Sequence, residues 1–168
     1  RLEYDHKKCT GVSATQRQQY HYYLQATAQQ GHVPAQESYS NLHEEFFMKS
    51  QNFNTLPRDE YIVKRDNFIV EKLTFLETAA EHGSLKAMTT LAGLYHSQNY
   101  GSKGWIKAYA YNQAILNFTD DNVLYRRYQG YIEKQGKSMS ESDMIEALAL
   151  SEQIVASVQS NGTLYSAK

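Results

Sequence analysis

The fold is decided by residues 79–95, which read AAEHGSLKAMTTLAGLY. A helix-forming run stops at Gly83, and a second run begins directly after Ser84. Glycine takes the left-handed conformation that ends a helix without a Cβ clash. The hydroxyl group of Ser84 can accept hydrogen bonds from the free N–H groups of the following first turn. The stretch therefore predicts two helices joined by a tight turn.

An earlier part of the chain carries the same pattern. Residues 23–42 (YLQATAQQGHVPAQESYSNL) align with residues 75–94 (FLETAAEHGSLKAMTTLAGL) at a shift of 52. The shift pairs Leu24 with Leu76, Ala28 with Ala80, Gly31 with Gly83, Ala35 with Ala87, and Leu42 with Leu94. A weaker third copy covers residues 107–134. Repeated helix–turn–helix units are typical of an α-solenoid, in which neighbouring units stack to bury their apolar faces. An ordinary helical bundle is the alternative.

Apolar spacing, caps and helix breakers predict helices throughout the chain. The expected segments are about residues 13–30, 34–50, 59–82, 85–98, 105–118, 122–135 and 141–159. No segment alternates polar and apolar residues as a strand does, so we expect an all-α fold, an α/α solenoid of about three helix–turn–helix repeats with a C-terminal capping helix. The expected parts are an N-terminal arm (1–12), a repeat array (13–139) with an insertion near 47–67, and a capping helix and tail (140–168).

Small residues in the helix at 85–98 are expected where neighbouring helices meet. Ala87, Ala92 and Gly93 would let two helix backbones approach closely. On this interpretation Ala92→Leu would overpack a helix contact and cost about 1–3 kcal/mol of stability.

The central segment resembles a known repeat family. Residues 87–115 (AMTTLAGLYHSQNYGSKGWIKAYAYNQAI) are similar to a Sel1-like repeat, a relative of the tetratricopeptide repeat. The matching positions are Ala87, Leu91, Tyr95, Lys107, Ala108 and Tyr111. Residues 139–159 are similar to the helix that often closes such arrays. The resemblance implies a bacterial, non-catalytic protein–protein interaction module.

Composition excludes few classes of protein. The 168 residues carry 17 Lys and Arg against 18 Asp and Glu, a net charge of −1, so no basic stripe indicates nucleic-acid binding. The single Cys9 cannot form an internal disulfide. No apolar run approaches the roughly 20 residues that span a bilayer, so a membrane-spanning protein is not expected. The chain opens at Arg1 without Met, which leaves a removed signal peptide open. The Sel1-like resemblance implies work in the envelope or after export, so we expect a periplasmic or exported protein, with the cytoplasm left open.

Sequence motifs for catalysis are incomplete. His6 and Cys9 supply two metal ligands without a second pair, and HEEFF at 43–47 lacks the second His of a zinc-protease helix. No phosphate loop or nucleophile elbow is present. We therefore expect no catalytic residue, metal or cofactor, and an enzyme using His43 or His82 as acid or base is the alternative.

The expected binding surface comes from the resemblance to tetratricopeptide geometry, in which the first helix of each repeat lines the concave side. It would carry Glu37, Asn41, Glu44, Lys86, Thr89, His96, Tyr125 and Gln129, facing a protein or peptide partner. Ordinary solvated helix faces are the alternative for each residue. The Sel1-like resemblance also implies a narrower alternative role, an immunity protein that neutralises a secreted toxin, for example a lipase effector. The insertion at 52–67 would then act as a wedge.

Overall fold

The computed structural model describes residues 13–97 and 103–161, and every regular element in these ranges is helical. The elements are α2 (Ala14–Gln29), α3 (Val33–Ser40), α4 (Glu44–Ser50), a short 3₁₀-helix η1 (Phe53–Thr55), α5 (Arg58–Glu81), α6 (Leu85–Ser97), α7 (Gly104–Phe118), α8 (Asn122–Gly136) and α9 (Glu141–Asn161). The all-α prediction is confirmed. The expected arm at 1–12 and the end of the tail lie outside the described residues.

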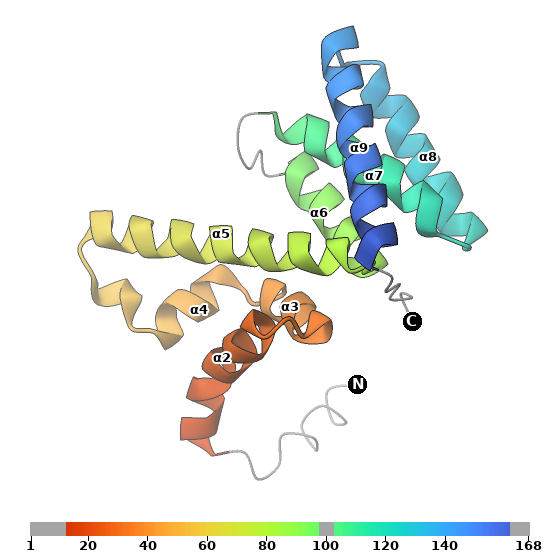
Figure 1. Cartoon of the computed structure of the whole chain (residues 1–168). Coiled ribbons are helices and arrows are strands. Elements are labelled where there is room, and N and C mark those ends of the chain that lie inside the picture. The colour runs from red at the N-terminus through yellow and green to blue at the C-terminus, as the bar shows by residue number, and fades with distance from the viewer. Residues whose placement is uncertain (1–12, 98–102, 162–168) are drawn as a thin grey trace.

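The long helix α5 connects two groups of helices (Figure 1). The preceding helices α2, α3 and α4 lie along one side of it, with α3 packed between α2 and α5. The second group, α6 to α9, gathers at the C-terminal end of α5, where α7 contacts α6, α8 and α9. Because α9 also contacts α5, the last helix joins the two groups.

Side-chain caps begin the helices where the sequence predicts them. Ser13 and Gln16 form a capping box at the start of α2, and Asp121 accepts hydrogen bonds from the first turn of α8. The Ser84 hydroxyl oxygen accepts a hydrogen bond of 3.0 Å from the backbone N–H of Ala87. These contacts satisfy N–H groups that have no partner inside the helix.

The turns at Gly31 and Gly83 share one geometry. Both glycines have a positive φ, 84° and 86° respectively. After Gly83 the cap is Ser84, and after Gly31 the ring Nδ1 of His32 accepts a hydrogen bond of 3.2 Å from the N–H of Ala35. The two turns therefore end one helix and begin the next in the same way, 52 residues apart.

Two large apolar clusters stabilise the two groups of helices. The first lies between α5, α6, α7 and α9, and Ala87 is completely buried in it. The second lies between α2, α3, α4 and α5, where Tyr39 is completely buried and the rings of Phe47 and Phe68 stack with centroids 3.9 Å apart. A smaller cluster of Ile106, Tyr109 and Ala147 joins α7 to α9.

The predicted helix over 34–50 is wrong, because the chain breaks into α3 and α4. The carbonyl oxygen of Leu42 accepts a hydrogen bond of 2.9 Å from the ammonium group of Lys72 on α5 instead of continuing the helix. Burial lowers the pKa of Lys72, because its ammonium group loses contact with water. The Leu42 carbonyl and the Phe68 ring, whose centroid lies 5.2 Å from the Lys72 nitrogen, compensate for part of that loss. The break turns Phe47 toward α5.

The expected insertion near 47–67 is folded onto α5. Its first residues, Phe47 and Met48, are buried, and Phe53 packs against the same cluster. The insertion covers the end of α4, η1 and the first turns of α5, with short connections between them.

Gly93 does not lie at a helix seam as expected. It is exposed, and a Cβ added to it would meet no atom within 4 Å. Ala92 is buried, with 4% of its surface exposed. Of the three small residues, Ala87 and Ala92 are therefore buried as the sequence predicts, and Gly93 is not.

Candidate partner-binding cleft

A cleft of about 530 Å³ opens between α6 and α8. Its lining residues come from α6, α7, α8 and the turn after α8: Thr89, Ala92, Gly93, His96, Asn112, Tyr128, Tyr131, Lys134, Gln135 and Ser138. Ala92 and Gly93 contribute almost no side chain, so space remains between the two helices. The cleft exists because small residues occupy the side of α6 that faces α8.

Two tyrosines of α8 provide apolar surface in the cleft. Tyr128 is 8% exposed and Tyr131 is 48% exposed. Their rings meet edge to face, with centroids 5.5 Å apart and planes at 86°. This arrangement is favourable for aromatic pairs, and it holds Tyr131 beside the opening.

A chain of hydrogen bonds connects three helices at the cleft. The side-chain amide of Asn112 on α7 donates to Oε1 of Gln135 on α8 over 2.8 Å. The amide nitrogen of Gln135 lies 3.2 Å from Nδ1 of His96 on α6. Since Asn112 occupies the acceptor of Gln135, the amide nitrogen of Gln135 donates to an unprotonated Nδ1 of His96. The chain fixes the position of α8 relative to α6.

The hydroxyl group of Tyr128 stays protonated in this environment. Burial raises the pKa of Tyr128 and the nearby Tyr131 adds to the increase, while a hydrogen bond with Thr89 and the charge of Arg127 act in the opposite direction. The net shift is upward, so Tyr128 is a neutral hydroxyl between α8 and α6.

The cleft is lined by cationic and neutral groups. None of its lining residues is Asp or Glu. Lys134 lines it from the last turn of α8 and is exposed. Among the charged groups of residues 13–97 and 103–161, no carboxylate pairs with its ammonium group.

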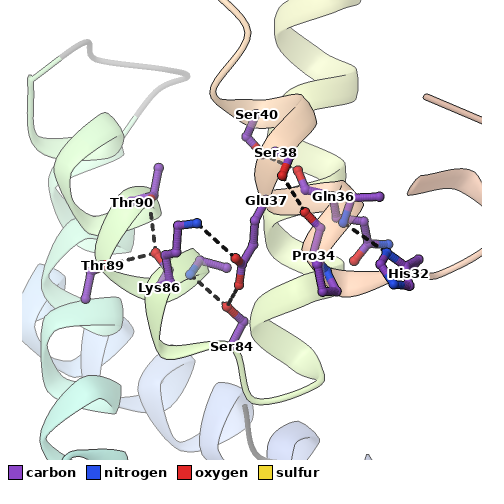
Figure 2. Close-up of polar contacts among 12 residues, drawn as sticks. His32, Pro34, Gln36, Glu37, Ser38, Ser40, Ser84, Lys86, Thr89 and Thr90 are labelled. Atoms are coloured by element: carbon purple, nitrogen blue, oxygen red, sulfur yellow. Dashed lines mark hydrogen bonds and ion pairs between the residues drawn. The ribbon is translucent and has the colours of Figure 1, made fainter. Parts of the chain in front are cut away.

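Two of the residues expected at a binding surface, Thr89 and His96, line the cleft. Two others, Glu37 and Lys86, contact each other instead: their charged groups are 3.1 Å apart. Figure 2 shows the Glu37 carboxylate between Lys86 and Ser84, whose hydroxyl group donates a hydrogen bond of 2.5 Å to it. Glu37 therefore connects α3 to the start of α6.

The remaining expected residues lie apart from the cleft. Asn41 is exposed at the C-terminal end of α3, and Glu44 lies 3.9 Å from Arg65 at the start of α4. Tyr125 and Gln129 are exposed on α8, but neither lines the cleft. The cleft thus includes two of the eight expected residues, Thr89 and His96.

The sequence interpretation missed the cleft residues of α7 and α8. Asn112 is the one buried amide among the buried residues of α7, which is a signal that could have marked it, since a buried amide needs partners. Tyr128 and Gln135 carry no such local signal, because the face that α8 presents depends on how it packs against α7.

The residues tested for catalysis, His43 and His82, lie at helix ends. His43 precedes α4 and is exposed, and Nδ1 of His82 lies 2.8 Å from the carbonyl oxygen of Thr78 at the end of α5. Within the described ranges, no three His, Cys, Asp or Glu residues form a group that could hold a metal ion. His6 and Cys9 lie outside those ranges.

Comparison with known proteins adds no relative: no family model, curated protein or solved structure matches this chain. In the part of the chain that the structure describes, no helix is both long and apolar enough to cross a bilayer.

Proposed function

We propose that this protein is a non-catalytic protein–protein interaction module that binds a peptide segment of a partner in the cleft between α6 and α8. The observation that carries the proposal is the cleft itself, about 530 Å³ with small residues along α6. The proposal includes a short Sel1-like solenoid in which α3 pairs with α5 and α6 with α7, while α8 and α9 both pack on α7. The cleft would then be part of its concave face.

The dimensions and composition of the cleft support binding of a few side chains. Ligand sites in proteins commonly enclose about 300–1,000 Å³ and combine apolar walls with a few polar groups. Here Tyr128 and Tyr131 supply aromatic surface, and Lys134 supplies a charged donor. Tyrosine is enriched among residues that dominate binding energy at protein interfaces.

The contacts inside the cleft favour binding over catalysis. A general base must reach a nucleophile or a substrate proton. The nitrogen Nδ1 of His96 accepts from the side-chain amide of Gln135, and the lining offers no carboxylate or thiol as a partner for it. The polar groups thus hold the helices in place and leave an open space between them.

Two matched glycine substitutions test this proposal. Gly93 lines the cleft, whereas Gly130 on α8 does not, and a Cβ at either position meets no atom within 4 Å. Gly93→Leu should fill the cleft, and Gly130→Leu should leave it open. Both variants should fold, because leucine favours a helix more than glycine does.

The measurement is photo-crosslinking from Tyr131, replaced by a photoreactive phenylalanine analogue, in extract of the source organism. We expect one crosslinked protein with the parent chain and with Gly130→Leu, and its loss with Gly93→Leu. Equal crosslinking by all three chains, or none by any, would overturn the proposal. If the captured protein is a toxin whose activity falls on binding, the module acts as its inhibitor.

A further inference from the structure

The charged lining of the cleft has one sign. Lys134 is the only Lys or Arg among its lining residues, and none of them is Asp or Glu. Some lysines elsewhere pair with carboxylates, as Lys86 does with Glu37 at 3.1 Å, and others, such as Lys137, form no ion pair within the described residues. At the cleft, Lys134 has no such counter-charge among the described residues. A negative charge on a ligand would supply it.

The other polar groups at the cleft add to this preference. The Arg127 guanidinium is close enough to act on the Tyr128 hydroxyl group, which stays neutral. His96 accepts from Gln135 through Nδ1, so its other ring nitrogen, Nε2, carries the hydrogen and is a donor. A basic side chain entering the cleft would therefore find no carboxylate and a like charge at Lys134, whereas a carboxylate would find a charge of opposite sign and hydroxyl donors.

Apolar surface lies directly beside these donors. Ala92 and Gly93 face the rings of Tyr128 and Tyr131 across the cleft. An aliphatic side chain can occupy the space over the two small residues and bury its surface against the rings. The lining thus offers an apolar position and a cationic position close together.

From this juxtaposition we infer that the cleft selects a peptide segment in which an acidic side chain lies next to an aliphatic one. The aliphatic side chain occupies the space above Ala92 and Gly93, and the carboxylate accepts from Lys134. The inference rests on the proposed function and narrows the partner to an acidic, partly apolar segment of a protein.

The test uses three capped hexapeptides that alternate Leu with Glu, Leu with Gln, or Leu with Lys. Each is titrated into isotopically labelled full chain, and amide chemical shifts of the cleft residues report the dissociation constant. We expect the Glu peptide to bind about ten-fold more tightly than the Gln peptide, the size of one charge-assisted hydrogen bond. The Lys peptide should bind more weakly still.

A pair of charge reversals at the end of α8 provides the control. Lys134→Glu should abolish the preference for the Glu peptide. Lys137, the exposed residue that ends α8, does not line the cleft, so Lys137→Glu should keep the preference although it changes the net charge by the same amount. An equal loss in both variants would show general charge attraction and overturn the inference.

The outcomes separate this inference from the proposed function. Equal binding of the three peptides at the cleft would overturn the acidic preference while supporting a peptide-binding module. Amide chemical shifts that do not change with any of the three peptides would overturn the inference. The proposed function would still be decided by the crosslinking experiment with Gly93→Leu. A preference for the Glu peptide that requires Lys134 supports both.

Discussion

The carboxylate of Glu37 on α3 lies 3.1 Å from the ammonium group of Lys86 on α6 and accepts a hydrogen bond of 2.5 Å from Ser84. The two partners of Glu37 differ in exposure. The Lys86 side chain is 53% exposed, whereas Ser84 is 1% exposed and also caps α6. A hydrogen bond from a buried hydroxyl to a charged group contributes more than an exposed ion pair.

Glu37→Ala should therefore lower the free energy of unfolding by about 1–3 kcal/mol, because Ser84 loses its acceptor. Lys86→Ala should lower it by less than about 1 kcal/mol, because the ion pair is exposed and screened by solvent. Urea denaturation of both variants measures the difference. An equal loss of stability in the two variants would show that the ion pair, rather than the Ser84 contact, holds α3 to α6.

Three buried tyrosines make the fold sensitive to alkaline pH. Burial raises the pKa of Tyr39, with Glu71 as its hydrogen-bond acceptor 2.5 Å away. Burial and the Glu77 carboxylate also raise the pKa of Tyr95. Tyr111 is stacked on Tyr95, and its pKa is raised by burial and by nearby carboxylates. In the unfolded chain, tyrosine ionises near pH 10.

The stabilising contribution of these tyrosines is complete below about pH 10 and is lost as the pH rises further, because the unfolded chain then releases protons that the folded chain keeps. Each tyrosine should add a slope of about 1.4 kcal/mol per pH unit to the fall in unfolding free energy. Urea denaturation at several pH values above 9 measures this slope. Tyr39→Phe should reduce the slope. An unchanged slope in that variant would contradict the attribution of the pH dependence to Tyr39.

The helix ends could be predicted because their signals are local. Ser13, Ser84 and Asp121 accept hydrogen bonds from N–H groups two or three residues further along the chain, so a short window of sequence contains both partners. The glycine turns at 31 and 83 are equally local, since the requirement for positive φ belongs to one residue.

The break between α3 and α4 could not be predicted because its cause is distant in sequence. Lys72 reaches the Leu42 carbonyl from 30 residues away, and Phe47 stacks on Phe68 only after α5 has packed. The cleft could be predicted only in part: Thr89 and His96 were expected from the resemblance to tetratricopeptide geometry, and they line it. The face of α8 depends on its docking against α7, so Tyr128 and Gln135 were missed in favour of Tyr125 and Gln129.

Alanine substitutions at two glycines separate backbone strain from packing. Neither Gly31 nor Gly93 has an atom within 4 Å of an added Cβ, but Gly31 has a φ of 84°. Gly31→Ala should lower the free energy of unfolding by about 1–2 kcal/mol, the cost of the left-handed conformation for an L-residue. Gly93→Ala should raise it by about 0.5–1 kcal/mol, because alanine favours the helix. Thermal denaturation of the two variants measures whether each substitution stabilises or destabilises the fold. Destabilisation by Gly93→Ala would show that this position is not open.

The two alanines of α6 should respond differently to enlargement, although both are buried. Ala87 is completely enclosed by the main cluster, so Ala87→Leu must displace its neighbours and should cost about 1–3 kcal/mol or more. Ala92 lines the cleft and is 4% exposed, so a leucine there can extend into free volume and should cost less than about 1 kcal/mol. This expectation replaces the larger cost that the sequence alone suggests for Ala92→Leu. Urea denaturation compares the two, and a cost at Ala92 equal to that at Ala87 would mean that the space between α6 and α8 is closed in solution, which would also remove the proposed binding site.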